Sequence, residues 1–126
     1  FPAYLQFLHL GEAGLAGPVN AVIATHILAP EAEWDNGTTR WAMRTFESRR
    51  GLVARQLAHS PYMAGDAFTA ADISVTYALQ LAERTGNAVP TEAERAYLAR
   101  TTGRAAYGRA MDSCAATKAW VAAMAG

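Results

Sequence analysis

The side chains that most often bind metals or act as nucleophiles are few in this sequence and lie far apart. The three histidines, His9, His26 and His59, include no pair spaced four residues apart, which is the spacing that zinc sites on a helix use. The lone cysteine, Cys114, excludes an internal disulfide and fits a reducing compartment. No serine lies in a Gly-x-Ser-x-Gly motif, and there is no glycine-rich phosphate loop. The sequence therefore predicts neither a metal site nor a catalytic residue in this chain.

Basic residues gather in one part of the chain, but they do not dominate its charge. The arginines of this run are Arg40, Arg44, Arg49, Arg50 and Arg55. Eleven lysines and arginines are balanced by eleven aspartates and glutamates over 126 residues. A neutral chain is not attracted to nucleic acid or to an anionic membrane, so we expect neither as a partner, and we interpret the run as a solvated helix face. No apolar stretch reaches the ~18 residues that span a bilayer.

The segment 68–73, Phe-Thr-Ala-Ala-Asp-Ile, has the pattern of a helix start. With Thr69 as N-cap, its hydroxyl can accept from the amide of Asp72, and the Asp72 carboxyl can accept in return from the amide of Thr69. Phe68 and Ile73 then occupy the two positions of a hydrophobic staple. An exposed cap of this kind contributes about 1 kcal/mol. At a buried helix start, we expect loss of the Asp72 side chain to cost more, because an amide is left unpaired away from water.

The elements around this cap are all expected to be helices. Alanine fills 29 positions, against six valines and three isoleucines, and this composition favours helix over strand. Apolar residues recur with a period of 3.6. The expected fold is an all-α bundle of about five helices in one domain, residues 1–126, with helices over about 2–29, 38–59, 70–85, a segment following Pro90-Thr91, and 104–117.

The first of these helices is apolar around most of its surface, so most of it must be buried. One strip of small and polar residues is expected to face water or a cleft: His9, Glu12, Ala13, Ala16 and Asn20.

Gly17-Pro18 predicts a kink or a break into two shorter helices, because proline has no amide proton and crowds the preceding turn. His26 lies on the apolar side and is predicted to be a core histidine. The next two helices are expected to contribute the core stripes, and the one over 70–85 to be the most buried.

Four segments together resemble one known family. Residues 61–73, Pro-Tyr-Met-Ala-Gly-Asp-Ala-Phe-Thr-Ala-Ala-Asp-Ile, resemble the most recognisable stretch of the C-terminal domain of glutathione S-transferases. Residues 5–12, Leu-Gln-Phe-Leu-His-Leu-Gly-Glu, look like the opening helix of many bacterial members. Residues 97–100 and 104–107 are similar to the closing helices. The resemblance covers nearly the whole chain, in the order of the family.

The resemblance implies a function that this chain would share with another domain. In the family, an N-terminal thioredoxin-like domain binds glutathione, and the helical domain forms a wall of the site for an electrophilic, apolar co-substrate. We therefore expect a cytoplasmic homodimeric transferase with glutathione as co-substrate, of which this chain alone is an inactive fragment with no cofactor of its own. By the same resemblance, the candidate substrate-binding residues are His9, Glu12, Ala13, Ala16, Asn20 and Trp120.

Other interpretations remain open from the sequence. Helical domains of this kind also occur as non-catalytic protein–protein interaction modules, and some family members have reductase or isomerase chemistry. His9 and Glu12 are equally explained as solvated polar positions, and Trp120 as a packing anchor. A thioredoxin-like domain ahead of Phe1 would favour the transferase.

Overall fold

The regular structure is helical throughout the part of the chain that the structure, a computed structural model, describes. That part is residues 1–125, without the side chains of 115–118 and 125. β structure within it is limited to one antiparallel bridge between Tyr62 and Gly65. The α-helices are α1 (Pro2–His9), α2 (Gly17–Leu28), α3 (Gly37–Leu57), α4 (Ala70–Arg84), α5 (Glu92–Thr102), α6 (Ala105–Ser113) and α7 (Ala115–Ala125), with a π-helix η1 (Leu10–Ala16) and a 3-10 turn η2 (Glu31–Glu33).

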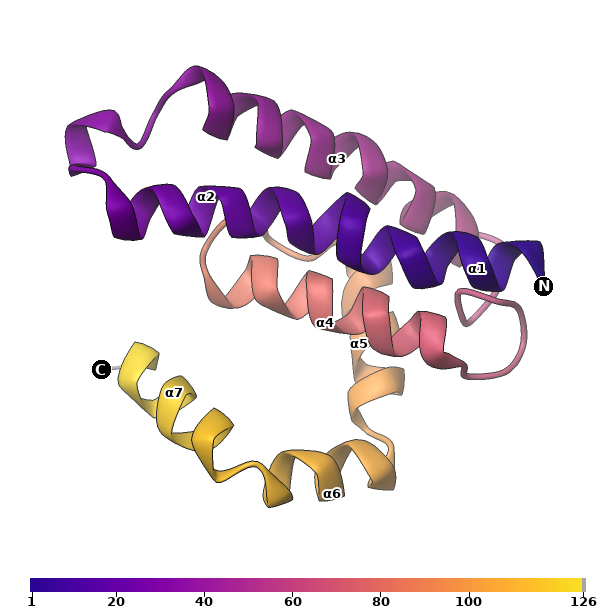
Figure 1. Ribbon diagram of the computed structural model, residues 1–126. Helices are drawn as coiled ribbons and strands as arrows, with labels where there is room; N and C mark the ends of the chain where they lie inside the picture. Colours follow the sequence, from indigo (N-terminus) through magenta and orange to yellow (C-terminus); the bar gives the residue numbers. More distant parts are fainter. Residues whose placement is uncertain (126) are drawn as a thin grey trace.

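The core lies where three helical layers meet. In Figure 1, α1, η1 and α2 follow one another as a long rod, α3 runs back along it, and α4 crosses beneath. Leu15, Val19, Phe46, Val53 and Val75 come from all three layers, and each is fully buried. α6 and α7 lie on the far side of α4 from the rod (Figure 1). The expected all-α bundle is confirmed at this level. No helix in the described residues is both long and apolar enough to cross a bilayer.

A kink or a break is predicted at Gly17-Pro18; the chain stays helical there, and the irregularity is the π-helix η1 that ends just before it. Pro18 cannot donate a hydrogen bond, and the amide of Gly17 donates to the carbonyl of Glu12, five residues back. On the same element, Gly11 packs directly on Ser74 of α4, whose hydroxyl donates to the Leu8 carbonyl at 2.8 Å. The first helix is therefore two α-helical segments joined by a π turn that rests on α4.

Arg50 corrects the interpretation of the arginine run as a solvated face. Its guanidinium donates to both carboxyl oxygens of Glu94 on α5, at 2.7 and 2.6 Å, and to the carbonyl of Val89. Glu94 is buried and also accepts from the amide of Thr91, as the N3 residue of a capping box that starts α5. Burial acts to raise the pKa of Glu94, but the bonds from Arg50 and Thr91 outweigh it and hold that pKa below its ordinary value.

Two further expectations about the helices are corrected. The segment 104–117 was expected to be one helix, but α6 ends at Ser113 and α7 begins at Ala115, so the chain turns between them. His26 was predicted to be a core residue, but it is exposed, and its ring stacks on Trp34 with centroids 4.3 Å apart. The helix over 38–59 is confirmed as α3, and the helix over 70–85 as α4.

Candidate functional site

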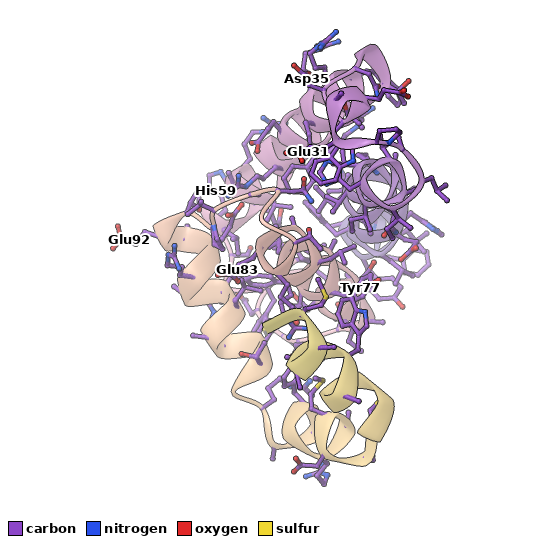
Figure 2. The ribbon with its side chains drawn as sticks, turned by 90° about the vertical axis from the view of Figure 1, so that its left-hand side faces the viewer. Glu31, Asp35, His59, Tyr77, Glu83 and Glu92 are labelled. Carbon is purple, nitrogen blue, oxygen red and sulfur yellow. The ribbon has the colours of Figure 1, made fainter. Side chains whose placement is uncertain are left out.

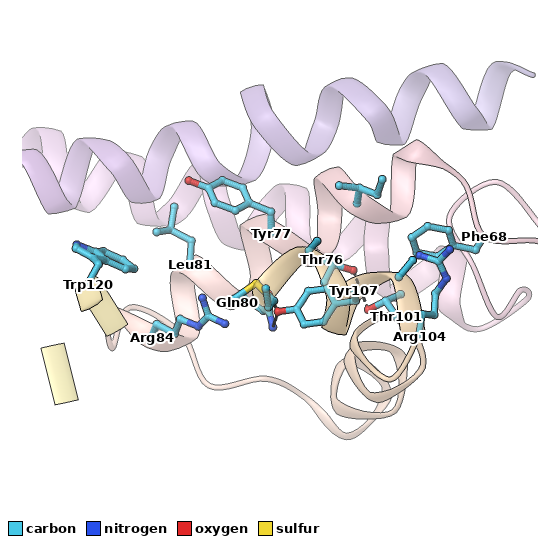
Figure 3. Close-up of a pocket in the computed structure, with 14 residues that line it drawn as sticks. Phe68, Thr76, Tyr77, Gln80, Leu81, Arg84, Thr101, Arg104, Tyr107 and Trp120 are labelled. Atoms are coloured by element: carbon cyan, nitrogen blue, oxygen red, sulfur yellow. Dashed lines mark hydrogen bonds between the residues drawn. The ribbon is translucent and has the colours of Figure 1, made fainter. Parts of the chain in front are cut away.

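The turn between α6 and α7 leaves an open cavity of about 680 Å³ against α4. Figure 3 shows it in close-up, with Phe68 and Arg104 at one end and Trp120 at the other. We call it the α4–α6 cavity. The residues that line it are Phe68, Ile73, Thr76, Tyr77, Gln80, Leu81, Arg84, Thr101, Arg104, Ala106, Tyr107, Ala110, Met111 and Trp120. Most of these side chains are apolar or aromatic.

One face of α4 forms the floor of this cavity. Ile73, Tyr77 and Leu81 follow one another at one turn of helix and all point to the same side. α4 has the most buried residues of any helix in the described chain, as predicted. Ile73 and Tyr77, however, remain 60% and 50% exposed, so this row of α4 lies on the surface of the cavity and not in the core. Figure 2 shows Tyr77 on the side of the ribbon where α7 lies.

Asp72 fixes the start of that floor. The predicted capping box with Thr69 forms, and the Thr69 amide donates to Asp72 Oδ2 at 2.8 Å. Asp72 is fully buried, and its Oδ1 also accepts from the amide of Met63 at 2.9 Å and from the hydroxyl of Tyr97 at 3.0 Å. Burial, together with the nearby Asp72 charge, raises the pKa of the Tyr97 hydroxyl. One carboxyl therefore ties α4 to α5 and to the loop before α4.

That loop holds the aromatic end of the cavity in place. The peptide groups of Tyr62 and Gly65 bond to each other, and the Tyr62 ring meets Phe68 edge-on, with centroids 6.1 Å apart. The guanidinium of Arg104 covers the face of the Phe68 ring, with its central carbon 3.4 Å from the ring centre. Phe68 and Ile73, the predicted staple pair, both line the cavity; the Phe68 ring contacts the edge-on ring of Tyr62 and the guanidinium of Arg104.

Polar side chains in the cavity lining bond mainly to each other. Gln80 Nε2 donates to the Tyr107 hydroxyl at 3.1 Å, so α4 and α6 are joined across the cavity. Thr76 donates to the Thr101 hydroxyl at 2.9 Å, and Thr101 donates in turn to a backbone carbonyl of α5. A site of this composition can enclose an apolar or aromatic molecule of small size.

The predicted substrate-binding residues are not gathered at one place. Trp120 lines the α4–α6 cavity and is 48% exposed. His9, Glu12, Ala13 and Asn20 are exposed on the α1–η1–α2 rod, as predicted, but outside the lining of this cavity. Ala16 is fully buried in the core, which corrects the expectation that it faces water or a cleft. A role in substrate binding for the residues of the rod stays a prediction.

The lining residues that the sequence does not predict come mainly from α4 and α6. They were missed because an apolar row on a central helix usually packs against another helix, and here α6 and α7 stand away from it. One signal was present in the sequence. Tyr77 within that row, and Gln80 and Arg84 beside it, have side chains with polar ends, which a fully packed helix face would exclude.

No group of three or more histidine, cysteine, aspartate or glutamate side chains suited to a metal ion occurs among the described residues. No family model matches the sequence, and no curated protein or solved structure matches it at a significant level.

Proposed function

We propose that this chain binds the apolar, electrophilic co-substrate in a protein that transfers glutathione to such compounds. The observation that carries the proposal is the α4–α6 cavity, which is open, about 680 Å³ in volume and lined mostly by aromatic and aliphatic side chains. Large apolar cavities with a few polar groups are where proteins bind small organic molecules. The sequence resemblance to the helical domain of glutathione S-transferases supplies the reaction.

The chemistry of the cavity supports a division of labour between this chain and a second domain. Its lining offers hydroxyl, amide and guanidinium groups, while the described lining residues include no thiol, imidazole or carboxyl group. Such a lining can hold and orient an apolar molecule. In the proposal, the nucleophile is the glutathione thiolate, bound by a thioredoxin-like domain of the same protein. The proposed protein is a homodimer in the cytoplasm, a location that the lone Cys114 fits.

The test uses the natural gene product that contains this chain. Its intact mass, compared with 13.4 kDa, shows whether a further domain is present. We expect conjugation of glutathione to an aryl halide, and we expect Tyr77→Ala to raise the KM for the aryl halide severalfold without changing the KM for glutathione. Tyr77 is half exposed, so its loss leaves the core intact.

Trp41→Ala is the matched control, because Trp41 is an exposed aromatic residue outside the cavity lining. Its KM for the aryl halide should match that of the unmodified protein. Absence of conjugation, or an equal effect of Tyr77→Ala on both KM values, would contradict the proposal. A gene product of 13.4 kDa without activity would favour the interaction module instead.

A further inference from the structure

The charged side chains among the described residues of the α4–α6 cavity lining are all positive. The described residues of its lining include two arginines, Arg84 and Arg104, and neither aspartate nor glutamate. Neither arginine forms an ion pair in the described part of the chain, whereas Arg40, Arg50 and Arg95 each face a carboxyl group within 4.0 Å. A largely apolar cavity with unpaired positive charge favours a ligand that is apolar and carries a negative charge.

Arg104 is the better placed of the two to bind such a charge. It is half-buried, and its guanidinium lies on the face of the Phe68 ring, 3.4 Å from the ring centre to the guanidinium carbon. Phe68 is itself held by the edge of Tyr62. Stacking occupies the flat face of a guanidinium and leaves the N–H groups in its plane for an acceptor. The group is therefore held in place before a ligand arrives, which lowers the entropy lost on binding.

Arg84 lacks these features. It is exposed, and no aromatic ring among the described side chains stacks on its guanidinium, so a bond to it would fix a long side chain in water. Exposed ion pairs of this kind contribute little. Figure 3 shows Arg84 and Arg104 at separate places along the cavity, with Gln80 and Tyr107 between them. Arg84 and Arg104 can therefore be compared within one cavity. They carry the same charge, but only the Arg104 guanidinium is held in place by an aromatic ring.

We propose that the α4–α6 cavity selects aromatic organic anions, with the carboxylate bound in the plane of the Arg104 guanidinium and the ring against Ile73 and Tyr77 of α4. This inference rests on the proposed function, since it names the class of compound that the proposed co-substrate site accepts. It adds a specificity-determining residue, Arg104, and it predicts discrimination between a carboxylate and its neutral analogue.

The experiment is calorimetric titration of the protein with 2-naphthoate and with 2-naphthamide, which share the ring and differ in charge. We expect 2-naphthoate to bind about tenfold more tightly, the range of a hydrogen bond to a charged group. Arg104→Gln should reduce this preference to less than twofold while leaving 2-naphthamide binding unchanged. Arg84→Gln, the matched control for the loss of charge, should retain most of the preference.

The outcomes separate this inference from the function on which it rests. Equal binding of the two compounds by the unmodified protein overturns the anion preference and leaves the apolar site in place. Binding of neither compound overturns both. A loss of preference in Arg84→Gln equal to that in Arg104→Gln overturns the assignment to Arg104. If Arg104→Gln also fails to bind 2-naphthamide, Arg104→Lys is the deciding variant, because a lysine ammonium group keeps the charge but has no planar set of N–H groups. A preference for 2-naphthoate that is unchanged in Arg104→Lys overturns the stacked geometry.

Discussion

Asp72 shows how one side chain can do more than its local pattern predicts. The sequence predicts its bond to the amide of Thr69, because a capping box depends on residues three positions apart. Its bonds from Met63 and Tyr97 span nine and 25 residues, and no local pattern encodes partners at those distances. The same limit explains Arg50, whose partner Glu94 lies 44 residues away on α5. Local chemistry is thus predictable here, and long-range pairing is not.

Asp72→Ala should lower the free energy of unfolding by about 3–5 kcal/mol, because it leaves the buried donors of Met63 and Tyr97 and the half-buried amide of Thr69 without an acceptor. Tyr97→Phe removes one of these bonds together with its donor and should cost only about 1 kcal/mol. Urea denaturation measures both values. Asp66→Ala, at an exposed position in the preceding loop, serves as control. A loss of under 1 kcal/mol for Asp72→Ala would show that Asp72 acts only as an ordinary cap.

At the scale of elements, the close contact between η1 and α4 requires a glycine, which has no side chain, at position 11. A Cβ atom on Gly11 would lie 2.5 Å from the backbone carbonyl carbon of Ser74. Gly11→Ala should therefore push η1 from α4 and lower the free energy of unfolding by about 1–3 kcal/mol. Gly108→Ala is the matched control, since nothing lies within 4 Å of a Cβ there and alanine favours the helix. In thermal unfolding, Gly11→Ala should lower the Tm and Gly108→Ala should raise it. Equal shifts of the Tm in the two variants would contradict the close packing of η1 on α4.

The ion pair between α3 and α5 makes a pH-dependent contribution to stability. The pKa of Glu94 is lowered in the folded protein from its ordinary value of 4.5, so the folded state holds that proton less tightly than the unfolded state. The stability it contributes is fully present above about pH 4.5 and is lost as the pH falls through the folded pKa. Urea denaturation of wild type and Glu94→Gln should therefore differ most near pH 7 and converge in acid.

Glu92→Gln is the control for this pH dependence, because Glu92 is exposed on the same helix. Its unfolding free energy should follow that of the unmodified protein at every pH. A difference between Glu94→Gln and wild type that stays constant down to pH 3 would mean that Glu94 acts by packing and not by its charge.

Helix bounds were predictable where turn residues mark them. Pro61, Gly65 and Pro90 separate α3, α4 and α5, and those helices lie close to their predicted ranges. No such signal separates α6 from α7, because the sequence around Cys114 contains neither proline nor glycine. The separation of α6 from α7 depends on tertiary arrangement, and the sequence alone predicts one helix across it.

For the whole molecule, the separation of α6 from α7 determines where a cavity can form. The turn after α6 brings Trp120 of α7 to the same space as Tyr77 of α4, and only their joint placement creates the lining. The family resemblance points to Trp120, whereas it does not point to the residues of α4 and α6. The spacing of the apolar residues of α4 and α6 also fits a packed core, because the sequence does not show whether another helix covers this face of α4.

Trp120 should report directly on occupation of the cavity. Trp34→Phe with Trp41→Phe leaves Trp120 as the single tryptophan of the chain. Nitrobenzene, an apolar quencher, should then quench its fluorescence along a saturating curve, because a bound molecule lies beside the indole ring. A second variant that keeps only Trp41, which is 60% exposed and outside the cavity lining, should show linear, collisional quenching alone.

The same pair of variants separates binding from accessibility. Trp120 is 48% exposed, less than Trp41, so collisions in solution should quench it less efficiently. Stronger quenching of Trp120 at low nitrobenzene concentration must then come from a bound molecule. Adding Tyr77→Ala to the Trp120 variant should raise the half-saturating concentration severalfold, since it removes the aromatic surface opposite. Linear quenching of both tryptophans, unchanged by Tyr77→Ala, would mean that the cavity does not bind apolar molecules.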